Sequence, residues 1–266
     1  MNRFSVLQAA PNFRDLGGMT TEDGRKIRHH RLLRSGHLAD LTAEDQQLLT
    51  GEYQLKTVVD LRTTGERARR PDVTMPGVAY LHCPIFDHAE EGVTREQVTV
   101  EDPVTSALAM ARRMEGQAFS QMTQLYTLFF EEPGIAHYRQ FFEILLRQEQ
   151  GAVLWHCTMG KDRCGTAAVL LETALGVPWS TVLEDYLFTN VRLGPITEAM
   201  IQQARPFAED ERLLEQMRIL DSAREEFLQA AVEKAVALSG SLEGFLRDEL
   251  GLSDTKREKL REMYLE

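Results

Sequence analysis

Residues His156 to Gly165 read HCTMGKDRCG, in which Cys157 and Arg163 lie six positions apart. The apolar run 152–155 precedes this segment, and a helix-like run, 166–175, follows it. A strand that enters a tight turn before a helix directs backbone N–H groups, and the positive end of the helix, into one small concavity, which binds a tetrahedral oxyanion. The segment therefore predicts a phosphate-binding loop made of Thr158, Met159, Gly160, Lys161, Asp162 and Arg163.

Cys157 lies at the base of this loop. Backbone amides, the helix terminus and Arg163 are expected to lower its thiol pKa well below the free value of about 8.5, which makes it a thiolate at neutral pH. A thiolate beneath a bound phosphate is a nucleophile in position. The planar guanidinium of Arg163 can hold two phosphate oxygens and stabilise the charge that spreads over them. The expected chemistry is therefore phosphoryl transfer.

The elements that must position this loop are indicated by apolar patterning. Strand-like runs lie at 57–61, 78–85 and 152–155. Helical patterns lie at 38–55, at 104–148 with a break at 131–134, and at 213–237. Asp23-Gly24 predicts the turn of a β-hairpin. The alternation implies an α/β fold with a mainly parallel sheet flanked by helices, whose ligands bind beyond the carboxyl ends of the strands, where Cys157 and Asp60 fall.

The loop resembles the Cys-x5-Arg signature of cysteine-based phosphatases, and its Gly-Lys-Asp-Arg interior is similar to the bacterial tyrosine and lipid phosphatase branch. Further segments are similar to that family's blocks in kind and order: NFRDLGG at 12–18, RLLRSG at 31–36, TVVDLR at 57–62, DYL at 185–187 and SLEGFL at 241–246. The resemblance implies a cysteine-phosphatase-like fold, which we expect to be a single domain over residues 1–266, and hydrolysis through a phosphocysteine without metal or organic cofactor.

Two aspartates compete to protonate the leaving group, which needs an acid within hydrogen-bonding reach of the ester oxygen. Asp162 lies inside the loop, and the resembled branch is thought to use its loop aspartate. Asp87, just after a strand-like run, is similar to the mobile acid loop of dual-specificity and phosphoinositide phosphatases. We favour Asp162, because it lies near the ester without a second segment having to close.

Four further residues are expected to support the site. In related phosphatases a lysine at the position of Lys161 is associated with multiply phosphorylated lipid headgroups as well as phosphotyrosine; the alternative is a solvated surface charge. The resemblance gives His156 a role in orienting the loop and lowering the thiol pKa. Asp60 and Arg62 either rim the pocket or form a buried pair that braces the loop.

Cys164 departs from the family pattern, which has Thr or Ser after the arginine. That hydroxyl normally hydrogen-bonds the nucleophilic sulfur and stabilises it as a leaving group in the second step, and a thiol is a weaker donor. A Cys157–Cys164 disulfide is one hypothesis, with Cys83 as the rival partner. Simple hydrophobic filling by Cys164 is the favoured alternative.

An amphipathic stripe at 104–130 precedes the strand that leads into the loop. It contains Leu108, Leu125, Leu128, Phe129 and Phe130 among polar residues. Such an insertion is expected to be a helical lid over the pocket, a membrane-facing surface, or a face that packs against the sheet, of which the last is commonest.

Composition excludes several classes. The 266 residues are 43% hydrophobic and 27% charged, which is typical of a folded globular chain, and the formal charge of −11 argues against nucleic-acid binding. We expect no integral membrane association, since no apolar run approaches about eighteen residues. Three cysteines and an N-terminus without secretory features favour the cytoplasm, and leave secretion without a signal peptide open.

The sequence therefore predicts a protein-tyrosine-phosphatase-like enzyme. Its expected partner is a phosphorylated protein or a phosphoinositide substrate, with phosphotyrosine preferred and phosphoserine or phosphothreonine as additions. One rival is a catalytically weak module that only recognises a phosphorylated partner. Another is a sulfurtransferase with a persulfide-carrying cysteine, which the Gly-Lys-Asp-Arg interior disfavours.

Overall fold

A computed structural model describes residues 7–85 and 102–266. One sheet has the strand order β1-β2-β5-β3-β4, with β1 antiparallel to β2 and every other pair parallel. The strands are β1 (Arg14–Asp15), β2 (Leu32–Ser35), β3 (Leu55–Asp60), β4 (Ala79–His82) and β5 (Ala152–His156). The mainly parallel α/β sheet expected from the sequence is confirmed, including the three predicted strands.

Eleven α-helices are found in the part of the chain that the structure describes. They are α1 (Ala43–Gly51), α2 (Thr64–Arg69), α3 (Pro103–Arg113), α4 (Ala118–Leu128), α5 (Gly134–Arg147), α6 (Asp162–Leu175), α7 (Trp179–Ala204), α8 (Glu211–Asp221), α9 (Glu225–Ser239), α10 (Leu242–Asp248) and α11 (Asp254–Tyr264). The predicted break at 131–134 is confirmed by the gap between α4 and α5.

Three predicted helical segments had the wrong extent. The segment expected before the break at 131–134 is two helices, α3 and α4, because the chain turns at Glu115 and Gly116, where φ is 49° and 79°. The helix expected over 38–55 is confined to α1, because a capping box of Thr42 and Asp45 starts it late and the chain turns at Gln54, where φ is 50°. The single helix expected over 213–237 is two helices, since Ser222 and Arg224 are both extended. The side chain of Asn190 on α7 holds this break by hydrogen bonds of 2.8 Å to both the N–H and the carbonyl of Ala223.

The expected N-terminal hairpin is reduced to one bridge. Thr20 pairs antiparallel with Lys26 across the Asp23-Gly24 turn, and Gly24 has a φ of 88°. The antiparallel strands themselves, β1 and β2, lie on either side of this bridged turn.

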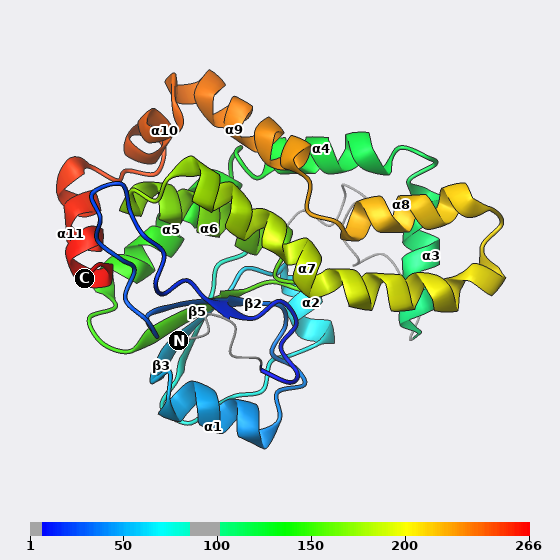
Figure 1. Ribbon diagram of the computed structural model, residues 1–266, viewed down its shortest axis with the longest axis horizontal. Helices are drawn as coiled ribbons and strands as arrows, with labels where there is room; N and C mark the ends of the chain where they lie inside the picture. The colour runs from blue at the N-terminus through cyan, green and yellow to red at the C-terminus, as the bar shows by residue number, and fades with distance from the viewer. Residues whose placement is uncertain (1–6, 86–101) are drawn as a thin grey trace.

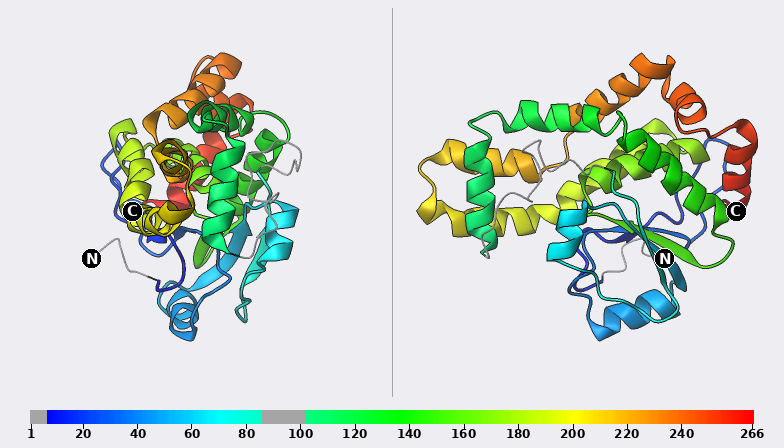
Figure 2. Two further views of the ribbon diagram at one scale, coloured as in Figure 1. Left: turned by 90° about the vertical axis from the view of Figure 1, so that its right-hand side faces the viewer. Right: turned by 180° about the vertical axis from the view of Figure 1, so that it is seen from behind.

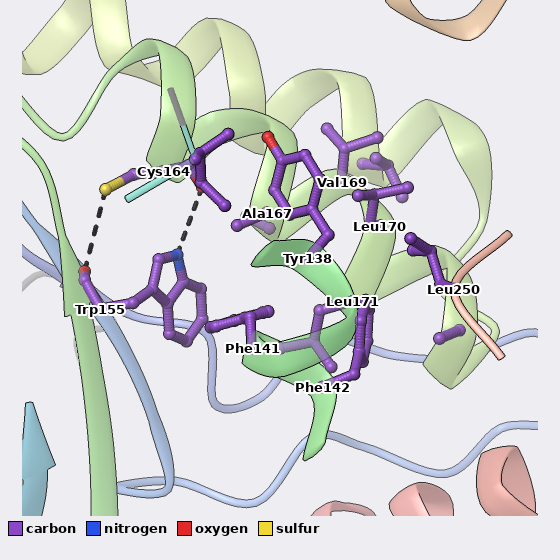
Figure 3. Close-up of a cluster of buried hydrophobic side chains, with 14 of the residues drawn as sticks. Tyr138, Phe141, Phe142, Trp155, Cys164, Ala167, Val169, Leu170, Leu171 and Leu250 are labelled. Carbon is purple, nitrogen blue, oxygen red and sulfur yellow. Dashed lines mark hydrogen bonds between the residues drawn. The ribbon is translucent and has the colours of Figure 1, made fainter. Parts of the chain in front are cut away.

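Helices cover both faces of the sheet, with α1 on one face and α5 and α6 on the other (Figure 1). An apolar cluster fills each side. Successive side chains of a strand point to opposite faces, so Val58 joins the cluster beneath α1 while Val59 joins the larger cluster on the opposite face. Figure 3 shows this larger core, in which Phe141 of α5 packs edge-on against Trp155 of β5 with 5.5 Å between ring centroids. The core fixes β5 against α6 and thereby the turn between them.

A helical lobe projects to one side of the sheet (Figures 1 and 2). It contains α3, α8 and the second half of α7, and α4 and α9 run back from it toward the main body. The lobe has its own apolar cluster, which includes Leu108 of α3, Ile201 of α7 and Leu214 of α8. Among the described residues, no helix combines the length and the apolar character needed to cross a bilayer.

Candidate active site

The predicted loop joins the carboxyl end of β5 to the first turn of α6. Ser35 of β2 and Asp60 of β3 are both in register with His156, the last residue of β5, so three strand ends meet beside Cys157. Gly160 has a φ of 67°, and a Cβ there would lie 2.5 Å from the carbonyl carbon of Ser35. Only glycine fits this position, because both the conformation and the space exclude a side chain.

Buried side chains from distant segments hold the loop through the carbonyl of Gly160. Asn12 Nδ2 donates to it at 2.8 Å and Arg34 at 3.0 Å. Asp185 on α7 in turn accepts hydrogen bonds from Arg14 at 3.0 Å and from Arg34 at 2.9 Å. Three of the sequence blocks that lie far from Cys157 therefore form one polar network behind the phosphate loop.

Cys157 lies at the base of a pocket and is 3% exposed. Burial alone would raise its pKa, but the nearby Cys164 thiol, the charge of Arg163 and the Cys164 backbone N–H outweigh burial and lower the pKa of Cys157 to about 6. The expectation of a low thiol pKa at this position is confirmed. The thiolate is the main form at neutral pH.

Arg163 is held by Glu66, a residue that the sequence reasoning missed. The two terminal nitrogens of Arg163 donate to the Glu66 carboxylate at 2.6 and 2.8 Å, and Thr158 Oγ1 donates to it at 2.6 Å. Burial would raise the pKa of Glu66, but Arg163 and Thr158 hold it well below its usual range. A guanidinium has a second bidentate edge, at Nε, on which a phosphate can bind.

One structural role of Glu66, the capping of α2, could have been predicted from the sequence. Glu66 closes a capping box with Thr63, in which the Glu66 N–H donates to Thr63 Oγ1 at 3.1 Å and the Thr63 N–H donates to the carboxylate at 2.9 Å. The Thr-x-x-Glu pattern marks the start of α2 in the sequence. Nothing in that pattern indicates the contact with Arg163, which lies 97 residues further along the chain.

Lys161 is buried, so the alternative of a solvated surface charge is wrong. Its ammonium donates to the carbonyls of Leu220 at 2.6 Å and Ser222 at 3.2 Å, and lies 3.1 Å from Oδ1 of Asp162. It therefore contacts the end of α8 as well as its neighbour on the loop.

Asp162 is the first residue of α6 and lines the pocket with Cys157. Tyr126 of α4, which no sequence pattern indicated, donates its hydroxyl to Oδ1 of Asp162 at 2.7 Å and contacts the Tyr186 hydroxyl at 2.8 Å. The helical segment 104–130 is thus connected directly to the candidate acid. The rival acid, Asp87, lies outside the described residues.

Asp60 and Arg62 form a buried pair, which was one of the two alternatives predicted from the sequence. Arg62 contacts Asp60 at 2.7 Å and Asp72 at 2.9 Å, and His156 Nε2 lies 3.0 Å from Asp72. Burial lowers the pKa of His156, but Asp60 and Asp72 outweigh it and raise it. The described pocket wall does not include Asp60 or Arg62, so this group braces the base of the loop from behind.

Three residues of this group, Asp60, Asp72 and His156, also have side chains of the kinds that bind metal ions. Single ligand atoms of Asp60, Asp72 and His156 lie within 4.8 Å of one another. The guanidinium of Arg62 contacts both carboxylates and already supplies the positive charge that a metal ion would bring. These residues therefore fit a buried ion-pair cluster around Arg62 better than a metal site.

Cys164 is fully buried behind the nucleophile, and all three cysteines are free thiols. Its sulfur lies 3.6 Å from the carbonyl oxygen of Ser35. It lies 3.9 Å from the carbonyl oxygen of Trp155, a contact that Figure 3 shows. Cys83 donates to the carbonyl of His137 at 3.0 Å, and burial raises its pKa to about 12. Cys83 is consequently a poor thiolate and a poor partner for disulfide exchange.

The pocket above Cys157 has an apolar wall from the helical lobe and α4. Its side chains are Met110, Met122, Leu125, Phe129, Met217 and Leu220, with Ala107 at the edge. The stripe at 104–130 is divided: Leu108 packs in the lobe, whereas Leu125, Phe129 and Phe130 belong to the main core.

A parallel sheet with a Cys-x5-Arg loop at the carboxyl end of its central strand, and a low-pKa thiol at the base of that loop, defines the class of cysteine-dependent phosphatases. The chain belongs to the tyrosine phosphatase family, whose family model matches residues 5–266. It is a phosphatase of the protein-tyrosine-phosphatase type. This assignment removes the sulfurtransferase alternative.

Two relatives of similar sequence agree with the family. A Cupriavidus necator protein whose name classes it as a candidate tyrosine-protein phosphatase is 30% identical over 243 residues, covering 90% of this chain and 81% of the relative. The triple specificity protein phosphatase PtpB of Mycobacterium tuberculosis is 28% identical over 278 residues, covering 97% of this chain and 98% of PtpB. A solved structure of P. aeruginosa TpbA in complex with pTyr is 16% identical, covers 79% of this chain and 90% of TpbA, and has a TM-score of 0.28.

Proposed function

We propose that this protein hydrolyses phosphotyrosine in proteins through a phosphocysteine on Cys157. The observation that carries the proposal is the thiol of Cys157, whose pKa is lowered to about 6 at the base of a pocket that also contains Arg163. A thiolate beneath an oxyanion site attacks phosphorus in line, and the arginine fork stabilises the oxygens during transfer.

The reaction has two steps. In the first, Cys157 Sγ forms a bond to phosphorus while the ester P–O bond breaks, and Asp162 gives its proton to the departing oxygen. In the second, Asp162 takes a proton from water as the water attacks phosphorus, and the S–P bond breaks to release inorganic phosphate and the thiolate. Asp162 suits both roles because it lines the pocket beside Cys157 and its carboxylate is oriented by Tyr126.

The apolar wall supports phosphotyrosine as the substrate. Phe129 and the methionines Met110, Met122 and Met217 border the space above the phosphate loop. Thioethers and aromatic rings pack well against an aromatic ring, whereas the short phosphoserine side chain would leave this wall uncovered. The name of the M. tuberculosis relative carries triple specificity. The substrate classes to compare with phosphotyrosine are those expected from the sequence: phosphoserine, phosphothreonine and phosphoinositides.

We propose further that the chain is a single phosphatase domain and that segment 104–130 is a fixed wall of its pocket rather than a freely moving lid. Leu125 and Phe129 line the pocket and belong to the main core at the same time, so displacing them would expose core surface.

The test is a profile of the purified chain on p-nitrophenyl phosphate, phosphotyrosine, phosphoserine and phosphothreonine peptides, with Cys157→Ser as the control. We expect phosphotyrosine hydrolysis that the control lacks. Phosphopeptide binding without turnover of any ester would instead support a recognition module.

A further inference from the structure

The ammonium of Lys161 is buried and is held by two backbone carbonyls and one carboxylate. An ammonium has three N–H donors. Three acceptors lie within 3.2 Å of it: the carbonyls of Leu220 and Ser222 and Oδ1 of Asp162. Two of these contacts are hydrogen bonds and the third is an ion pair, and because the residue is only 3% exposed, the ammonium is held by the protein rather than by solvent.

These contacts attach the phosphate loop to the junction of α8 and α9. The carbonyls of Leu220 and Ser222 belong to the C-terminal end of α8, where the last carbonyls of a helix lack partners within the helix. Asn190 of α7 holds the next residue, Ala223, from the other side by two hydrogen bonds of 2.8 Å. Lys161 and Asn190 are therefore two tethers on one short segment.

That segment is part of the pocket wall. Leu220 and Asp221 line the pocket, as does Met217 one turn earlier on α8. To bind a second phosphate, Lys161 would have to release the α8 carbonyls, and each hydrogen bond from a charged donor that is lost without replacement is costly. The wall would lose its attachment to the loop at the same moment.

Among the residues that the structure describes, the other charges of the pocket do not replace this cation. Its described ionisable lining consists of Glu66, Cys157, Lys161, Asp162, Arg163 and Asp221. The terminal nitrogens of Arg163 are paired with Glu66, and Lys161 faces Asp162. A second phosphate group would therefore meet carboxylates and an apolar wall, which disfavour an additional dianion.

We propose that Lys161 is a positioning residue that fixes the α8–α9 junction against the phosphate loop, and that the pocket consequently selects singly phosphorylated esters of aromatic alcohols over multiply phosphorylated headgroups. The inference rests on the proposed phosphatase function and names its substrate class. It differs from the expectation that Lys161 contacts a second phosphate.

The test compares Lys161→Met with Asn190→Ala, which removes the other tether of the same segment. Each variant and the wild type are assayed on a phosphotyrosine peptide and on short-chain phosphatidylinositol bisphosphate. We expect Lys161→Met to lower kcat/KM for both substrates by the same factor, within about twofold, because a lost positioning contact affects every ester. Amide hydrogen exchange at 217–224 is expected to rise in both variants.

A loss of bisphosphate hydrolysis at least about tenfold greater than the loss of peptide hydrolysis would overturn the proposal, since it would mark Lys161 as a ligand of the second phosphate. A second measurement uses the wild type alone and so does not depend on whether a variant folds. Inositol trisphosphate is expected to inhibit p-nitrophenyl phosphate hydrolysis no better than phenyl phosphate does. Markedly stronger inhibition by the trisphosphate would also overturn it. A wild type that hydrolyses none of these esters would refute the phosphatase proposal itself.

Discussion

Removing the carboxylate of Glu66 is expected to impair both stability and catalysis. The side chains of Arg163 and Glu66 are only 12% and 8% exposed, so solvent screens their ion pair little. Breaking a buried pair by removing one partner costs roughly 3–5 kcal/mol, which we expect for Glu66→Ala. Glu66→Gln keeps the shape and one acceptor, and is expected to cost about 1.5–3 kcal/mol.

The catalytic effect follows from the orientation of Arg163. Without the carboxylate, neither the guanidinium nor the Thr158 hydroxyl is held in place. If about 1.4–2.8 kcal/mol of transition-state stabilisation is lost, kcat/KM falls roughly tenfold to hundredfold. Urea denaturation followed by circular dichroism measures the stability, and initial rates with phenyl phosphate measure kcat/KM.

Thr63→Ala is the matched control. It removes the hydroxyl that caps α2 and is expected to cost about 1 kcal/mol of stability. The Glu66 carboxylate and its contacts with Arg163 remain, so kcat/KM is expected to stay near the wild-type value. If Glu66→Gln keeps wild-type kcat/KM and stability, the carboxylate does not hold Arg163 in its active orientation.

The same ion pair gives stability a dependence on pH. Because the folded pKa of Glu66 is held below its unfolded value of about 4.3, its stabilisation is fully present above that value and is lost as the pH falls below it. The stability difference between wild type and Glu66→Gln is therefore expected to be constant at neutral pH and to narrow below about pH 4. A difference that widens in acid would contradict the assignment of the charge.

Four further predictions concern the loop. Arg163→Lys is expected to be severely impaired in steady-state kinetics despite its retained charge, because an ammonium lacks the bidentate fork. Asp162→Asn is expected to slow hydrolysis of phenyl phosphate far more than that of p-nitrophenyl phosphate, whose leaving group needs little protonation; equal slowing would point to another acid. Cys164→Thr is expected to raise kcat and reduce the pre-steady-state burst, because a hydroxyl stabilises the departing sulfur better; an unaltered burst would contradict this. Alkylation of Cys157 by iodoacetate is expected to slow as the pH falls through about 6, where its thiolate is protonated, and a midpoint near 8.5 would show an ordinary thiol.

The sequence was sufficient for the parts of the fold that depend on local pattern. The strands β3 and β5 and the turn before α6 were predicted because apolar runs and Gly160 act over a few residues. The long α7 was not anticipated, and the break between α8 and α9 was missed because its cause is the side chain of Asn190, more than thirty residues away.

The site shows the same division between local and distant contacts. The low pKa of Cys157 follows from its own loop. The direction of the Lys161 side chain depends on where α8 ends, and the partner of Arg163 comes from α2. Residue types alone do not show which of several charges will meet in the folded chain, so Lys161 was interpreted as a phosphate ligand or a surface charge.

The central claim is that Cys157 carries the phosphoryl group between the two steps. The most direct measurement is acid quenching of the enzyme during the first turnover of a phosphotyrosine peptide, followed by peptide mass spectrometry. We expect a phosphorylated peptide whose modification lies on Cys157, and we expect no such peptide from Cys157→Ser. Rapid turnover with no phosphoenzyme, or with phosphate on another residue, would contradict it.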